Sequence, residues 1–144
     1  MTASRDKLTF GLLPLIARLL LTAEFAIAVN GKITDWSGQA GYMASHGMTM
    51  IAPLLGAALV IELVGTLALV TGYQARAAAA VMFVYLGIVG VRLHDFWNIA
   101  DPMAAGGAQT QFFKNVGMMG GLLMIAAYGP GRWALGRRDD AQGA

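Results

Sequence analysis

Cysteine is absent from the 144 residues of this chain. Its absence excludes a disulfide framework, an iron–sulfur site and a thiol relay within the chain. Charge is also scarce, because Asp, Glu, Lys and Arg make up 12% of the residues, whereas a soluble domain has about a quarter. No basic patch is interleaved with aromatic side chains, so we expect no nucleic-acid partner. These shortages argue against a soluble domain.

Long apolar runs fill most of the chain, which is 57% hydrophobic. Four runs lie at about residues 10–29, 50–70, 77–91 and 110–128, and polar segments separate them. The last run, from Phe112 to Tyr128, gives roughly 25 Å of helix, enough to cross most of a bilayer core. The sequence therefore predicts an all-α integral membrane protein. We expect a single transmembrane domain over residues 1–144 that forms a four-helix bundle in the lipid bilayer.

The last run ends sharply at Gly129-Pro130-Gly131, because glycine terminates a helix and proline prevents its continuation. We expect the tail, residues 134–144, to be disordered. Within the run, small residues predict a flat helix face that another helix can approach closely. They are Gly117, Gly120 and Gly121. This face predicts a homo-oligomer if the other helices leave it uncovered.

The N-terminal segment imitates a signal peptide, since Arg5 and Lys7 precede an apolar run. Pro14, Arg18 and Glu24 interrupt that run, which is too polar for the apolar part of a signal peptide. We therefore interpret the segment as an uncleaved first span.

Positive charge is uneven between the two sides of a four-span topology. One side carries Arg5, Lys7, Arg76, Arg132, Arg137 and Arg138. The other side carries Lys32, with Arg92 at a helix end. Because Lys and Arg concentrate in cytoplasmic loops, we expect both termini in the cytoplasm. The loops at 31–48 and 99–108 then face outward, and we expect a short surface helix in the first of them.

Six polar side chains fall inside or at the edges of the predicted spans, where an ionisable group needs a partner or a water-filled cavity. These candidate ligand-binding residues are Arg18, Glu24, Glu62, His94, Lys114 and Asn115. They lie in the middle or the outer half of the spans, which predicts a pocket that opens outward above Arg18 and Glu62. His46 and His94 match no metal-ligand spacing, so we predict no metal site.

Depth along the helices predicts which of these charges pair. At about 1.5 Å per residue, Arg18 and Glu62 lie at similar depths near the middle of their spans. We therefore predict an Arg18–Glu62 ion pair and a second pair between Glu24 and Lys114. A purely structural interpretation stays open, because membrane bundles also use polar pairs to hold helices together.

Several short segments, taken in order, resemble the DoxX family of small bacterial membrane proteins. They are Arg18–Leu21 with Phe25, Gly31-Lys32, Ile61–Gly65 with Gly72 and Arg76, His94–Trp97, Gln111–Asn115 with Gly120-Gly121, and Gly129–Trp133. The resemblance extends from about Leu8 to Leu135. It implies a multi-pass, four-helix protein of the bacterial cytoplasmic (inner) membrane. Members of the family are linked to thiosulfate:quinone oxidoreduction and to redox complexes that handle thiol and oxidative stress, and others look like assembly factors.

Two functions follow from the residues and the resemblance. In the first, the chain is a redox-associated subunit that binds a small apolar or quinone-like ligand, with Lys114, Asn115 and His94 as hydrogen-bond donors and a carboxylate as proton relay. A redox partner protein is then needed, because the chain has no cofactor motif beyond a possible quinone site. In the second, the chain is a non-catalytic scaffold or assembly factor whose ion pairs are structural. Whether the chain is itself an enzyme stays open.

Overall fold

The computed structural model describes residues 11–135, none of which is in a β-strand. Within this part of the chain, five α-helices and one 3-10 helix follow one another. They are α2 (Leu13–Thr34), α3 (Trp36–Ser45), α4 (Ile51–Thr71), α5 (Ala75–Leu93), η2 (Phe96–Asn98) and α6 (Pro102–Tyr128). The predicted all-α fold is confirmed, and α3 is the short helix expected in the first polar loop.

Three segments are long and apolar enough to cross a membrane. They are α2, α4 and the stretch Ala75–Asn98, which contains α5 and η2. Helix α6 is longer than any of them, but Lys114, Asn115 and several glycines make it less apolar. The crossing of the bilayer by α6, and hence the count of four spans, stays a prediction.

Two predicted helix boundaries were wrong by more than a turn. Helix α2 continues through Asn30 and Gly31 to Thr34, because these residues lower helix propensity without breaking the helix. Helix α6 begins at Pro102, inside the segment 99–108 that was predicted to be a loop. The Asp101 carboxylate accepts a hydrogen bond from the Ala104 backbone N–H at 2.8 Å and caps the helix, and proline is well suited to the first helical position.

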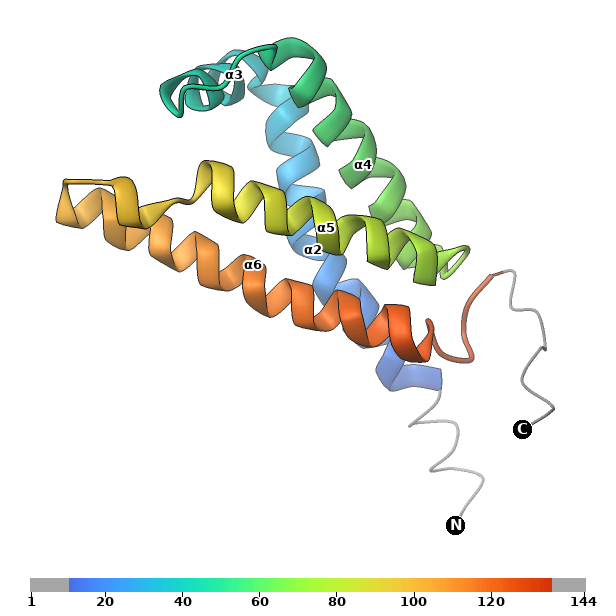
Figure 1. Ribbon diagram of the computed structural model, residues 1–144. Coiled ribbons are helices and arrows are strands. Elements are labelled where there is room, and N and C mark those ends of the chain that lie inside the picture. The colour runs from blue at the N-terminus through green and yellow to red at the C-terminus, as the bar shows by residue number, and fades with distance from the viewer. Residues whose placement is uncertain (1–10, 136–144) are drawn as a thin grey trace.

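The helices form two packed pairs, α2 with α4 and α5 with α6, joined through the contact between α4 and α5. Figure 1 shows α5 and α6 side by side, with α2 behind them and α3 at one end of the molecule. One buried cluster joins the helices from their middles to the ends opposite α3. It comprises Phe25, Leu69, Ala75, Ala79, Met82, Leu86, Leu122 and Ile125. The packing is therefore tight towards that end, which we call the closed end: the start of α2 and the C-terminal ends of α4 and α6.

Backbone carbonyls at the C-terminal ends of α4 and α6 accept hydrogen bonds from other segments at the closed end. The Arg76 guanidinium donates to the carbonyls of Ala126 (2.9 Å) and Ala127 (3.1 Å), in the last turn of α6. The backbone N–H of Leu135 donates to the Thr71 carbonyl at 2.8 Å, in the last turn of α4. The predicted disordered tail is therefore wrong at Leu135, because this residue is fixed against α4. Residues 136–144 lie outside the described part.

Candidate functional site

A cavity of about 360 Å³ lies between the four long helices and reaches α3. Apolar side chains form much of its wall, among them Phe25, Leu55, Leu86, Met118 and, from α3, Met43. Its volume falls within the range of small-molecule pockets. We call it the central cavity. Five of the six predicted site residues line it, and these are Glu24, Glu62, His94, Lys114 and Asn115.

A buried polar cluster joins three helices at the wall of the central cavity. The Lys32 ammonium lies 2.9 Å from Oε1 and 2.8 Å from Oε2 of Glu62. The Tyr85 hydroxyl donates to the same Oε1 at 2.6 Å. Lys32 and Glu62 are 9% and 4% exposed, so water screens their attraction little. The cluster therefore links α2, α4 and α5, and it places a carboxylate, an ammonium and a phenol on one cavity.

The sequence analysis missed Lys32 and Tyr85 as site residues. It assigned Lys32 to the loop after the first span, whereas the residue lies in the last turn of α2. From there its long aliphatic stem lets the ammonium reach Glu62 in the middle of α4. Glu62 itself was the available signal, because a carboxylate inside an apolar span requires a partner.

Glu24 and Lys114 form the second predicted ion pair, and this prediction is confirmed. The Lys114 ammonium donates to Oε1 of Glu24, from the middle of α6 to the middle of α2. The two side chains are 38% and 40% exposed, in contrast to the buried Lys32–Glu62 pair. This pair therefore bridges two helices at an accessible position along the wall of the central cavity.

Asn115, His94 and Arg92 add further polar groups to the lining of the central cavity. Asn115 is 5% exposed. The Nδ1 atom of His94 is buried and has no hydrogen-bond partner among the described residues. A buried polar atom without a partner is uncommon and disposes the site towards a ligand or water that supplies one. Across residues 11–135, no three or more His, Cys, Asp or Glu side chains are arranged to hold a metal ion.

The predicted Arg18–Glu62 pair was wrong, and Arg18 does not line the central cavity. Its guanidinium instead donates to backbone carbonyls at the closed end, to Leu69 (2.9 Å), Val70 (3.3 Å) and Trp133. The depth count placed the outer end of the first span at residue 29, but α2 continues to Thr34, which moves Arg18 towards the opposite end. Arg18 therefore caps α4 and fastens the segment after α6.

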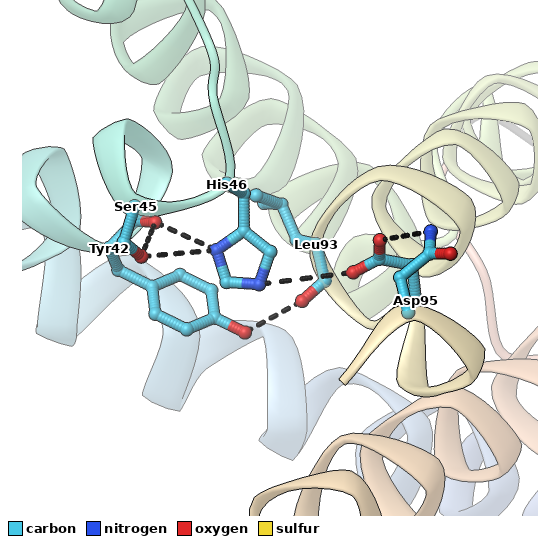
Figure 2. Close-up of polar contacts among 6 residues, drawn as sticks. Tyr42, Ser45, His46, Leu93 and Asp95 are labelled. Carbon is cyan, nitrogen blue, oxygen red and sulfur yellow. Dashed lines mark hydrogen bonds and ion pairs between the residues drawn. The ribbon is translucent and has the colours of Figure 1, made fainter. Parts of the chain in front are cut away.

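Helix α3 is fastened to the C-terminal end of α5 and to the residues just after it, as Figure 2 shows. The Tyr42 hydroxyl donates to the Leu93 carbonyl at 2.6 Å. His46 Nε2 lies 4.0 Å from Oδ1 of Asp95, and its Nδ1 contacts the Tyr42 carbonyl at 2.9 Å. Burial and the nearby Asp95 carboxylate both raise the pKa of the Tyr42 phenol, which keeps it a hydrogen-bond donor. Tyr42 and Met43 line the cavity, so α3 covers one end of it.

The sequence of this chain is similar to those of known membrane proteins. The DoxX family model matches residues 13–95, more than half of the chain. The chain belongs to the DoxX family. It is 34% identical over 126 residues to the inner membrane protein YphA of Escherichia coli (strain K12), and the aligned residues cover 86% of this chain and 88% of the relative. It is 32% identical over 124 residues to the inner membrane protein YqjF of the same organism, which covers 85% and 88%. No solved structure matches.

The DoxX match extends from α2 through α5, so Lys32, Glu62 and Tyr85 all lie within it. Lys114 and Asn115, in α6, lie beyond it. Both relatives are named as inner membrane proteins, and three segments of this DoxX protein are apolar enough to cross a bilayer. The protein is therefore a multi-pass inner-membrane protein.

Proposed function

We propose that this DoxX protein binds a small, largely apolar ligand of the quinone class in the central cavity and serves as a subunit of a membrane redox system. One observation carries the proposal, namely that an apolar cavity of about 360 Å³ contains the Lys32–Glu62–Tyr85 cluster and the unpartnered His94 Nδ1. A ligand ring packs against the apolar wall, and its carbonyl oxygens accept hydrogen bonds from the polar groups.

The polar residues have separable roles in this proposal. In this proposal His94 and Asn115 donate hydrogen bonds to the ligand carbonyls, a role that their position in the cavity lining supports. Reduction of a quinone adds protons, and the Glu62 carboxylate with the Tyr85 phenol is the pair best placed to relay them. Electrons come from a redox partner protein. Arg18 has no role at this site, because its guanidinium is used at the closed end.

Equilibrium binding of a tail-less benzoquinone to the purified protein tests the proposal. Asn115→Leu removes a buried amide and keeps most of its volume, so we expect roughly threefold to tenfold weaker binding, the worth of one hydrogen bond. The control is Gln111→Leu, which removes an exposed amide four residues earlier on α6 and should leave binding unchanged. Equal binding by both variants, or no binding by the unmodified protein, contradicts the proposal.

A second function, a scaffold or assembly factor without ligand, has one observation in its favour. Each ion pair bridges two helices, α2 to α4 through Lys32–Glu62 and α2 to α6 through Glu24–Lys114, as structural pairs do. The scaffold function predicts that loss of these pairs changes only stability and assembly. A protein that has no affinity for quinones, yet loses stability in Lys32→Met, supports the scaffold.

A further inference from the structure

A second hollow lies between α2 and α6. Helix α2 packs mainly on α4 and α3, and α6 packs mainly on α5 and η2, so a groove of about 760 Å³ stays open between them. It extends along α6 from Lys114 to Tyr128, ~21 Å at the helical rise. Much of its wall is apolar, with Leu20, Leu21, Met124 and Ile125 among the lining side chains. We call it the lateral groove.

The lateral groove and the central cavity share a boundary. Glu24, Lys114 and Met118 line both. The Glu24–Lys114 ion pair therefore lies between a cavity that contains hydrogen-bonding groups and a groove that is largely apolar. Two half-exposed charges in the middle of α2 and α6 are costly if they face only hydrocarbon, whereas a polar headgroup beside them lowers that cost.

We infer that the lateral groove holds the aliphatic or isoprenoid tail of the ligand whose headgroup occupies the central cavity, and that the ligand enters between α2 and α6. This inference rests on the proposed function. The position of the lateral groove and the side chains that line it indicate what occupies it. The groove runs along α2, one of the helices that are apolar and long enough to span a membrane. Its charged residues, apart from Arg18 at the closed end, lie where it meets the cavity. An amphipathic molecule with one polar end fits this arrangement, with its polar end in the central cavity and its apolar tail in the lateral groove.

Two glycines of α6 provide a matched test of the groove. Gly117 lines the lateral groove, and a Cβ atom added there meets nothing within 4 Å. A leucine at this position therefore begins with a Cβ atom that meets no neighbour, and its side chain takes up part of the groove. Gly120 is equally free of contacts, but it lines neither the groove nor the cavity. Gly120→Leu thus controls for the change in helix propensity and for the added apolar surface.

Binding of two quinones to the purified protein separates the two sites. For Gly117→Leu we expect the affinity for a decyl-substituted benzoquinone to fall about tenfold, because the leucine side chain competes with the tail for space in the groove. The affinity for the tail-less benzoquinone should not change, and Gly120→Leu should leave both affinities unchanged. If the unmodified protein binds both quinones and Gly117→Leu affects neither, the lateral groove is refuted while the cavity stands. If the protein binds no quinone, both proposals fail.

Cysteine labelling provides an independent measurement, because the natural chain has no cysteine. In Gly117→Cys, the decyl-substituted benzoquinone should slow labelling by an apolar thiol reagent, and the tail-less compound should not. In Gly120→Cys, neither should protect. Equal protection at both positions, or none at Gly117→Cys, overturns the inference. The inference is also overturned if Gly117→Cys is protected from labelling in the absence of ligand and loses this protection when a dimer dissociates. In that case a second copy of the chain occupies the groove.

Discussion

At the level of single residues, two kinds of contact hold charged side chains within the helices. Arg18 donates to backbone carbonyls, where it satisfies acceptors that the end of α4 leaves open. Lys32 and Glu62, like Glu24 and Lys114, bind each other across helices. The two kinds should respond differently to mutation, because only the second leaves an unpaired opposite charge behind.

The Lys32–Glu62 pair should show strong coupling. Lys32→Met leaves the Glu62 carboxylate buried with Tyr85 as its remaining polar partner, and we expect a loss of about 3 kcal/mol in the free energy of unfolding. Adding Glu62→Gln removes the orphaned charge, so the double variant should be more stable than Lys32→Met alone. Thermal unfolding in detergent measures both.

Lys32→Met, Glu62→Gln and the double variant form a double-mutant cycle, and its matched control combines Glu62→Gln with Arg18→Met. Arg18 makes no contact with Glu62, and its hydrogen bonds go to carbonyls at the closed end. The two effects should therefore add within experimental error. Additivity for Lys32 with Glu62, or strong coupling for Arg18 with Glu62, would reverse the assignment of partners.

At the level of elements, the turn between α4 and α5 depends on Gly72. Its φ is +78°, and an added Cβ would lie 2.4 Å from the Ala134 Cβ and 2.6 Å from Nη1 of Arg18. Gly72→Ala should lower the free energy of unfolding by about 1–3 kcal/mol through backbone strain and steric overlap. Gly56→Ala, within α4 where a Cβ meets nothing, should be neutral or stabilise by up to about 1 kcal/mol. Equal melting temperatures for the two variants would contradict this account of the turn.

Helix α3 should loosen when its bond to α5 is removed. Tyr42→Phe deletes the hydroxyl that donates to the Leu93 carbonyl, so amide hydrogen exchange in Trp36–Ser45 should become roughly threefold to tenfold faster. Tyr73→Phe, at an exposed residue near the closed end, should leave α3 unchanged. Unchanged exchange in Tyr42→Phe would mean that other contacts fasten α3.

The sequence predicts the elements better than their ends. Apolar runs locate α2, α4, α5 and the second half of α6, because their apolar composition and spanning length are properties of a single segment. The extensions of α2 through Asn30 and Gly31, and of α6 back to Pro102, depend on tertiary contacts and on the Asp101 cap. At both places, helix propensity alone gives only weak evidence for a helix.

At the level of the whole molecule, the arrangement of the helices in the membrane is still a prediction. Single cysteines at Ser4 and Ser37 should label from opposite sides of the membrane if both termini are cytoplasmic. Ser4 lies outside the described residues, and Ser37 lies in α3. The absence of natural cysteines makes any labelling specific. Labelling of both from one side would contradict the topology.

The sequence predicted most of the polar residues that line the central cavity, but it did not predict all of the pairs that they form. Depth along a helix follows from residue counting, and it correctly brought Glu24 and Lys114 together. The direction in which a side chain points, and how far a lysine stem reaches, depend on the packing of neighbouring helices. Counting paired Glu62 with Arg18 because it ended the first span five residues too early and could not show the reach of Lys32, whereas the folded chain pairs Glu62 with Lys32 and Tyr85.

Mass spectrometry of the ligand that co-purifies with the protein from its own membrane tests the central claim most directly. We expect an organic extract of the unmodified protein and of Gln111→Leu to contain a quinone in proportion to protein. The extract of the correctly folded double variant His94→Leu/Asn115→Leu should contain far less. Equal amounts of quinone in all three extracts, or none in any, would contradict a ligand site in the central cavity.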